Sequence, residues 1–529
     1  MYSREFFQEF LPSLKVVFAF FCMVGCASSV EPTEPTEPTS ASAVTGAESV
    51  DQPPHIFLIV VDGLRTDRAG FGGNERNTTP NLDHFASQSV IFDNSFSQSN
   101  ESLLSHASMF TGEYPSEIAH PNYLTYVIPD SATVLAEAMA AVGYDTAAFV
   151  AGGHVKGLFG FLQGFNVFEE SRDFGTFFDT VPLAFDWLDR RKASDGPIFM
   201  MLHGYDLHRP YGKASVFFHP FGDLYPSWVD SRITRRSFTE RIYKKTFYQN
   251  FRHPRTKHGS GERILNPTSY RTMAEWVETA TPEELDRSKS LSDEDIKDLR
   301  IHYDASVLMA DTYVGLFLDD LERRGLMQDA VVIITSDHGE GLQEHNLCNH
   351  RMGLYDTTTK VPMIIGGGAI PDAWRGTRNP NLIAAIDVPN TVTEIAGTVP
   401  LAGSHGRSLW AMLKGESFDE LEAVYQEGVI GHIALRTAKW RLVFDGLDLP
   451  RPELDDELAS LPIESERFML FDSVNDPMEQ NNLTGSETEQ AERLREALVR
   501  LRSQLKKGDA KMELSPEIKK MLQDKGGYF

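Results

Sequence analysis

Short, uninterrupted runs of apolar residues indicate the buried strands of this chain. Three of them are Ile56–Val61 (IFLIVV), Ile198–Leu202 (IFMML) and Val331–Ser336 (VVIITS). Short, β-branched runs that are apolar at almost every position are typical of strands buried on both faces, as in a parallel sheet covered by helices. Helical patterns lie between the strands, at Ser131–Gly143 and at Ala305–Gly325, where a glycine ends the second. This alternation predicts an α/β doubly wound, mainly parallel sheet.

Acids and imidazoles follow these predicted strands directly. Asp62 comes after the first run, His203 after the second, and Asp337 with His338 after the third. Ligands of doubly wound sheets bind just beyond the carboxyl ends of the strands, so three such ends predict a site there. We interpret His203 as a buried residue at a strand end and leave it out of the predicted site.

The hydrophobic pattern changes near residue 404. Residues 423–446 (AVYQEGVIGHIALRTAKWRLVFDG) are typical of short antiparallel strands, and Glu487–Lys507 has the pattern of an amphipathic helix. We therefore predict a larger α/β domain over residues 55–403 and a smaller α+β subdomain over residues 404–529.

A basic, aromatic-rich stretch interrupts the larger domain over about residues 212–299. It includes RITRRSFTERIYKKTFYQNFRHPRTKHGSGER, in an otherwise acidic protein. Two interpretations stay open at this point. The stretch is either a solvated helical insertion or a lid whose cations meet an anionic substrate.

The N-terminal segment has the features of an export signal. Val16–Gly25 is apolar but too short to span a bilayer, and it leads through MVGC to Cys26. This resembles a bacterial lipobox, in which Cys26 carries the lipid anchor; a plain secretory signal is the alternative. Residues 1–26 are thus predicted as a lipoprotein-type signal peptide and residues 27–54, with their Pro/Thr/Glu repeat, as a disordered tether. The expected location is an exported, membrane-anchored lipoprotein at the outer membrane, periplasm or cell surface.

Composition narrows the class of partner. The 529 residues include 76 acidic and 50 basic side chains, for a net charge of −26 at pH 7, which argues against a nucleic-acid partner. Beyond the predicted signal, only Cys348 remains of the three cysteines. No intramolecular disulfide is therefore expected, and stability has to come from the core.

Five segments, in a fixed order along the chain, carry a family resemblance. They are HIFLIVVDGLRTDRAGFGG, TPNLDHFASQSVIFDNSFSQS, SLLSHASMFTG, TSDHGEGLQEH and, near the C-terminus, MLFDSVNDPMEQNNL. Together they resemble the sulfatase family of the alkaline phosphatase superfamily. The resemblance implies an α/β sheet domain with a smaller C-terminal sheet subdomain, as the hydrophobic pattern also predicts.

Ser102 falls on the nucleophile position of that family. In that family a cysteine or serine at this position is oxidised to formylglycine within a Cys/Ser-x-Pro-x-Arg motif. This chain has Leu104 in place of the proline and His106 in place of the arginine. Formylglycine at Ser102 and an unmodified Ser102 both stay open. As a helix start, this position would offer free backbone N–H groups to a sulfate or phosphate. The alternative is that Ser102 only caps the helix.

The resemblance also implies one divalent metal, bound by Asp62, Ser102, Asp337 and His338. Gly63 replaces a second strand-end carboxylate of the family, and His338 stands where many sulfatases have asparagine. A site with an imidazole and fewer oxygens suits Mn or Zn as well as Ca. This Asp/Asp-His pattern resembles the phosphonate monoester hydrolase branch, which cleaves phosphate and sulfate esters.

Further histidines match functional positions of the family. His208 matches a histidine before x-Pro that protonates the leaving group, and His350 takes the place of a substrate-binding lysine. With His106 at the arginine position, the predicted catalytic set is Ser102, His106, His208 and His350, and anion binding is expected to depend on pH. His154 and Lys156 lie where many sulfatases have a Lys/His pair, but their spacing differs and we do not carry them over.

The predicted function is that of a metal-dependent sulfatase-family hydrolase acting on a sulfate ester of a saccharide or small molecule. One alternative is a phosphomonoesterase, phosphodiesterase or phospho-group transferase with unmodified Ser102. Another is a surface lipoprotein that binds anionic glycans without catalysis. The acids and histidines kept at the site argue against the last, because binding alone needs no histidine that protonates an ester.

Overall fold

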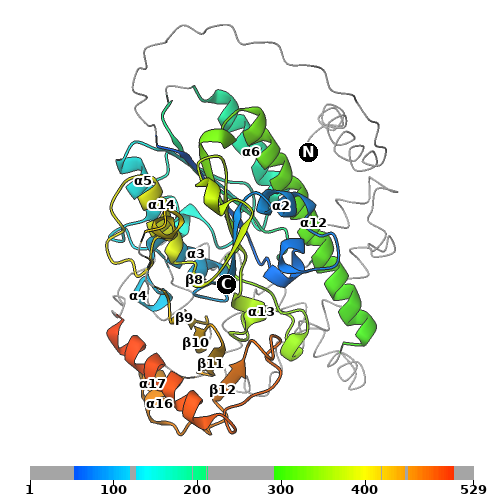
Figure 1. Cartoon of the computed structure of the whole chain (residues 1–529), viewed down its shortest axis with the longest axis vertical. Coiled ribbons are helices and arrows are strands. Elements are labelled where there is room, and N and C mark those ends of the chain that lie inside the picture. The colour runs from blue at the N-terminus through cyan, green and yellow to red at the C-terminus, as the bar shows by residue number, and fades with distance from the viewer. Residues whose placement is uncertain are drawn as a thin grey trace, which may run out of the picture. The chain divides into compact units, whose positions relative to one another are not determined.

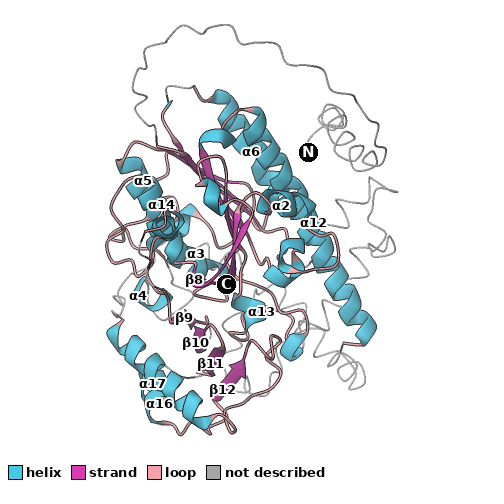
Figure 2. Ribbon diagram, in the orientation of Figure 1, coloured by secondary structure: helices cyan, strands magenta, loops and turns pink. Residues whose placement is uncertain are grey.

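A mixed eight-stranded sheet forms the centre of the larger domain (Figures 1 and 2). The computed structural model describes residues 53–118, 127–192, 195–209, 211 and 291–505, except 417, 419, 430, 447, 448 and 450. The predicted signal peptide, the tether up to residue 52 and nearly all of the predicted insertion lie outside these residues. No helix among the described residues is long and apolar enough to cross a membrane.

The strand order places the three predicted strands side by side. The order is β4-β3-β5-β1-β6-β7-β2-β8, and every pair is parallel except those made by β7 with β6 and β2. The bounds are β1 His55–Val61, β2 Val90–Phe96, β3 Asp145–Val150, β4 Val167–Glu170, β5 Ile198–Gly204, β6 Ala330–Thr335, β7 Met363–Gly366 and β8 Thr377–Ala384. The predicted doubly wound, mainly parallel sheet is confirmed.

Both faces of this sheet are covered by helices, which explains the uniformly apolar strands. Along β1, Ile56, Leu58 and Val60 pack into one core cluster with α3, α5 and α14, while the alternate residues pack into another with α2, α6 and α12. These two sets of helices flank the sheet in Figure 1. Their bounds are α2 Pro80–Ala86, α3 Ser102–Thr111, α5 Leu135–Ala141, α6 Phe177–Arg190, α12 Asp293–Arg323 and α14 Asp387–Ile395.

Two predicted helix boundaries differ from the structure. The helix predicted from residue 131 begins only at Leu135, because Val134 is still extended and its N–H is bound by the Glu137 carboxylate. The helix predicted from residue 305 begins at Asp293, inside the predicted insertion. Its first turns are polar and carry little hydrophobic signal, but the Ser292 hydroxyl accepts a hydrogen bond from the N–H of Asp295 and caps the helix.

The C-terminal part forms a second, antiparallel sheet, as predicted. Its order is β12-β11-β10-β9, and helices α16 and α17 supply residues to the core cluster of this sheet. Buried ion pairs join it to the larger domain, because Arg436 and Arg441 both contact Asp356 at the start of α13. The bounds are α13 Asp356–Thr359, β9 Ala423–Glu427, β10 Ile433–Thr437, β11 Trp440–Phe444, α16 Arg451–Ser460, β12 Phe468–Asp472 and α17 Thr488–Gln504.

The remaining helices are short connections. Short α-helices are α4 Pro115–Ile118 and α15 Leu409–Leu413, and 3-10 helices are η1 Thr66–Arg68, η2 Gly70–Gly72, η4 Gly157–Phe159, η9 Met327–Asp329, η10 Glu344–Asn346 and η11 Asp372–Trp374.

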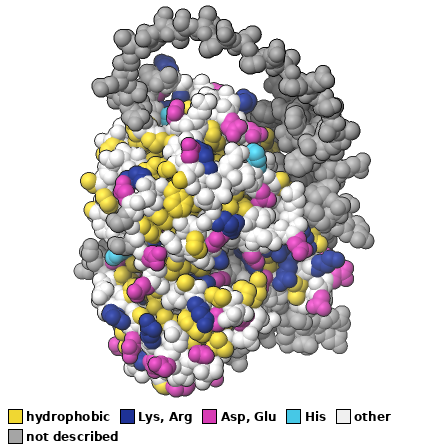
Figure 3. Space-filling view, viewed as in Figure 1, with side chains coloured by type: hydrophobic (Ala, Val, Ile, Leu, Met, Phe, Trp, Pro, Cys, Tyr) yellow, Lys and Arg dark blue, Asp and Glu magenta, His cyan; other side chains and the backbone are white. Residues whose placement is uncertain are grey.

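The surface carries mixed charges. On the face drawn in Figure 3, acidic and basic side chains are interspersed and apolar ones are scattered between them.

Candidate active site

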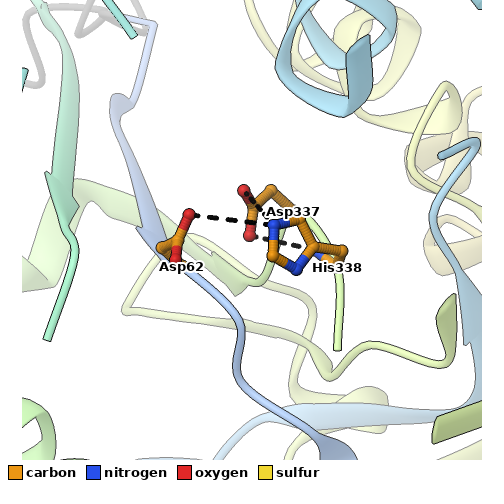
Figure 4. A group of neighbouring side chains, drawn as sticks. All are labelled: Asp62, Asp337 and His338. Atoms are coloured by element: carbon orange, nitrogen blue, oxygen red, sulfur yellow. Dashed lines mark hydrogen bonds and ion pairs between the residues drawn. The ribbon is translucent and has the colours of Figure 1, made fainter. Parts of the chain in front are cut away.

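Asp62, Asp337 and His338 come together at the carboxyl ends of two neighbouring strands. Asp62 follows β1 and the other two residues follow β6, and β1 and β6 pair in parallel. One ligand atom from each of the three side chains lies within 4.8 Å of the others, and all three residues are buried. Figure 4 shows the side chains pointing toward one another. The structure therefore assembles three of the four predicted metal ligands from distant parts of the sequence.

The hydrogen bonds of this triad leave some of its ligand atoms available to a metal ion. Asp337 Oδ1 accepts the N–H of Gly63 at 3.0 Å and of His338 at 2.9 Å, whereas the buried Oδ2 has no hydrogen-bond partner among the described residues. His338 Nδ1 donates to the Gly339 carbonyl at 2.7 Å, which leaves a lone pair on Nε2. A carboxylate oxygen and an imidazole nitrogen in this state fit a divalent cation.

Electrostatics keep the Asp337 ligand in its charged form. Burial alone would raise the pKa of the Asp337 carboxyl. The neighbouring His338 and His106 imidazoles outweigh this effect and hold that pKa well below its usual value. The carboxylate is therefore ionised at neutral pH, as a metal ligand has to be.

Ser102, the fourth predicted ligand, is the first residue of α3 and faces the triad. Its hydroxyl donates to Asp62 Oδ2 at 3.0 Å and lies 3.1 Å from His338 Nε2. The residue at the N-cap is Glu101, whose carboxylate accepts from the N–H of Leu103 and Leu104. The alternative that Ser102 merely caps the helix is therefore wrong.

The same capping overturns a second expectation. We expected free N–H groups at the start of α3 to bind the substrate anion, but Glu101 occupies those of Leu103 and Leu104 at 3.0 and 3.3 Å. The N–H of Ser105 is also used, by the Glu101 carbonyl at 3.0 Å. An acidic side chain at the N-cap competes directly with an external anion for these donors. The N–H groups of Leu103, Leu104 and Ser105 are therefore not available to an anion.

Sequence reasoning missed the residues around Glu101. His154 Nδ1 lies 2.7 Å and Arg351 Nη2 lies 3.3 Å from Glu101 Oε1. His154 follows Gly153, whose φ is +63° and where a Cβ would lie 2.6 Å from the Tyr205 ring, so only glycine fits there. The AGGHVKG segment was the available signal for His154, although its spacing differs from the family pattern.

His350 lies beside the triad, and His208 lies beside His350. The His350 ring stacks on His338 with ring centres 4.1 Å apart, and the half-buried His208 ring lies 6.2 Å from that of His350. Burial lowers the pKa of His350, and the nearby His338 lowers it further. His208 Nδ1 donates to the Arg209 carbonyl at 2.9 Å. The catalytic roles of both histidines stay predictions.

His106 lies one turn after Ser102 on α3 and is fully buried. Its Nδ1 donates to the Ser102 carbonyl at 2.7 Å and lies 3.5 Å from Asp337 Oδ2. Its ring packs against Phe161 and against His203, which is buried in β5 as the sequence indicated. Burial lowers the pKa of His106, so the neutral ring is favoured at neutral pH. A contact of His106 with the substrate anion stays a prediction.

Comparisons with known proteins identify the family of this chain. The family model described as Sulfatase matches residues 54–398. The choline-sulfatase of Rhizobium meliloti (strain 1021) is 23% identical over 480 residues, which cover 82% of this chain and 85% of that protein. The ulvan-active sulfatase of Formosa agariphila is 24% identical over 456 residues, covering 84% and 80%.

Solved structures share the fold. One, determined in complex with its substrate D-glucosamine-2-N,6-O-disulfate, superposes with a TM-score of 0.62 at 19% identity and covers 87% of this chain and 99% of its own. The phosphonate monoester hydrolase of Agrobacterium radiobacter also has a TM-score of 0.62 at 19% identity, covering 86% and 96%. The family match spans well over half of the chain. The chain therefore belongs to the sulfatase family, the sulfuric ester hydrolases of the alkaline phosphatase superfamily.

Proposed function

We propose that this protein is a metal-dependent hydrolase of sulfate esters on saccharides, with Ser102 as the residue that attacks or contacts the sulfate. One observation carries the proposal: the Ser102 hydroxyl lies 3.0 Å from Asp62 Oδ2 and 3.1 Å from His338 Nε2, two atoms of the metal-binding triad. The sulfated-sugar substrates of similar proteins, such as D-glucosamine-2-N,6-O-disulfate, support the saccharide class.

Each residue of the site then has a defined task. Asp62, Asp337 and His338 would hold the divalent ion, which when bound stabilises the negative charge that develops on the ester oxygens. The Asp62 carboxylate accepts the hydrogen bond of the Ser102 hydroxyl and thereby orients its oxygen. His208, in its doubly protonated form, would donate a proton from Nε2 to the oxygen of the departing alcohol, while its Nδ1–H stays bound to the Arg209 carbonyl.

A phosphoesterase with unmodified Ser102 is the second candidate. Two observations favour it: Leu104 and His106 replace the proline and arginine of the family's modification motif, and the fold superposes on a phosphonate monoester hydrolase. The ion in either case is Ca, Mn or Zn. The imidazole of His338 in the triad favours the last two.

One paired experiment separates the candidates. Turnover of 4-nitrophenyl sulfate and 4-nitrophenyl phosphate is measured on the same preparation, and the mass of the peptide that contains Ser102 is determined. A sulfatase should prefer the sulfate and carry formylglycine, which has two hydrogen atoms fewer than serine. Preference for the phosphate with an unmodified serine would favour the second candidate. No turnover of either ester would contradict both.

His208→Ala is expected to reduce turnover most for esters with poor leaving groups. An alkyl or sugar alcohol needs the proton that His208 supplies, whereas 4-nitrophenolate leaves without one, so kcat/KM should fall about 10²- to 10⁴-fold for a sugar sulfate and far less for the nitrophenyl ester. The exposed His84 on α2 offers a control, since His84→Ala should change neither rate. Equal losses on both esters would rule out the proton donor role.

We also propose that Cys26 anchors the protein to a membrane. The proposal rests on the apolar Val16–Gly25 stretch, the MVGC sequence and the tether-like repeat that follows. Cys26→Ser should move the protein from the membrane fraction to the soluble fraction or leave the precursor uncleaved, as followed by fractionation and immunoblotting. An unchanged membrane fraction with normal processing would contradict the anchor.

A further inference from the structure

A guanidinium lies beside the start of the helix that carries Ser102. Arg351 Nη2 is 3.3 Å from Oε1 of Glu101, the residue directly before Ser102. The Arg351 side chain keeps 20% of its surface exposed, whereas the Glu101 side chain has none. The guanidinium is therefore partly accessible to solvent, whereas the carboxylate that it contacts is fully buried.

Glu101 is a rigid support for this arginine. Its Oε2 accepts from the N–H of Leu103 and Leu104, and its Oε1 contacts His154 Nδ1 at 2.7 Å. The main chain of Arg351 is also held, because its backbone N–H donates to Asn349 Oδ1 at 2.9 Å. These contacts hold Glu101 in place, and Glu101 in turn holds the guanidinium next to the residue that precedes Ser102.

The site needs a fixed positive charge in addition to its metal. A sulfate monoester is an anion, and the site that it has to approach contains the buried carboxylates of Asp62, Asp337 and Glu101. The N–H groups of Leu103 and Leu104 at the start of α3 are already bound by Glu101, and the family's lysine position holds the buried His350, stacked on His338. Arginine, unlike histidine, stays charged at every physiological pH.

Resting on the proposed function, we infer that Arg351 binds oxygens of the scissile sulfate group and that Glu101 is its positioning residue. The planar guanidinium has five N–H donors, so it can contact Glu101 and a tetrahedral anion at the same time. The anion would then be held from three directions: by Ser102, by the cation of the triad, and by Arg351.

Binding of inorganic sulfate tests this inference. Sulfate is used as a competitive inhibitor of 4-nitrophenyl sulfate hydrolysis, and its dissociation constant is also measured directly by calorimetry. Arg351→Ala should weaken sulfate binding about 10-fold or more and lower kcat/KM by about 10- to 100-fold, as expected for loss of a charged hydrogen bond. Arg351→Lys should restore part of the affinity, because lysine keeps the charge but not the fork.

Arg407 provides a matched control. Its side chain is 17% exposed and contacts the buried Asp387 at 2.8 Å, so it resembles the pair of Arg351 and Glu101 in burial and charge, away from the site. Arg407→Ala should leave sulfate affinity within about twofold, whatever it does to stability. If Arg351→Ala also stays within about twofold while its metal content is normal, the inference is overturned.

The role of Glu101 is tested by a double-mutant cycle. Glu101→Gln should weaken sulfate binding less than Arg351→Ala does, and the two changes together should be no worse than Arg351→Ala alone. Additive losses would show that Glu101 does not act through Arg351. Added ethylguanidinium should raise the activity of Arg351→Ala but not of Glu101→Gln, an effect that a purely structural role would not produce.

Failure of the proposed function would be recognisable separately. A chain that binds sulfate in the calorimeter but turns over neither aryl ester would contradict the hydrolase proposal. In that case the loss of sulfate affinity in Arg351→Ala would still support Arg351 as the anion contact. Conversely, full turnover with unchanged sulfate affinity in Arg351→Ala would overturn only the inference about Arg351.

Discussion

Ser102→Ala is expected to lower kcat/KM on the preferred aryl ester by about three orders of magnitude or more, as is usual when a nucleophile is removed. The hydroxyl is the group of α3 that faces both Asp62 and His338, at 3.0 and 3.1 Å, and alanine has nothing to replace it. The loss should appear in kcat, while the metal content changes less, because the three residues of the triad remain.

Two other serines on α3 provide comparison variants for this prediction. Ser108 is buried on the same helix and its hydroxyl has no hydrogen-bond partner among the described residues, so Ser108→Ala should be close to neutral. Ser105→Ala should have an intermediate effect, because the Ser105 hydroxyl donates to the Asp337 carbonyl and joins α3 to the metal-binding loop. Near-normal turnover of Ser102→Ala on both the sulfate and the phosphate would refute Ser102 as the reacting group.

Asp337→Asn is expected to abolish both metal binding and activity. The amide oxygen of asparagine can keep the contacts that Oδ1 makes to the N–H groups of Gly63 and His338. The change removes the negative charge at Oδ2, which faces the triad. Activity should fall by about 10³-fold or more, and elemental analysis should find less than a stoichiometric amount of bound metal. Adding back Ca, Mn or Zn to the metal-free wild-type protein identifies the ion by the activity that it restores.

Asp311 is a suitable control for this variant. It is also a fully buried aspartate, but it lies on α12, where it accepts from the N–H of Leu82 and Asn81 at the start of α2. Asp311→Asn therefore tests the cost of a buried amide without touching the triad, and it should keep the metal content of the unvaried protein. Full metal occupancy in Asp337→Asn would show that the ligand set is wrong.

Much of the fold could be predicted from the chain because its strands are buried on both faces. The runs at residues 56–61, 198–202 and 331–336 became β1, β5 and β6, which lie side by side, so the acids that follow β1 and β6 had to meet at one sheet edge. Helix boundaries were less predictable. The polar first turns of α12 carry no hydrophobic period, and their helical state depends on the Ser292 cap and on packing against the sheet.

The residue types of the candidate site were determined by the sequence itself. Asp62, Ser102, Asp337 and His338 stand in motifs whose order along the chain identifies the family, and each motif is local in sequence. A strand that ends in an aspartate places that side chain at the sheet edge in any doubly wound fold. The triad could therefore be named before its geometry was known.

Only the tertiary structure decided which charges are available to a substrate. Glu101 at the N-cap, its contacts to His154 and Arg351, and the burial of His106 and His350 join segments that lie far apart in the chain. No local pattern contains these contacts. Burial shifts a pKa, and a carboxylate occupies backbone donors, only through neighbours that the fold brings together. The fold lowers the pKa of His106 and His350 by burial, and it brings the Arg351 guanidinium to Glu101, the residue before Ser102.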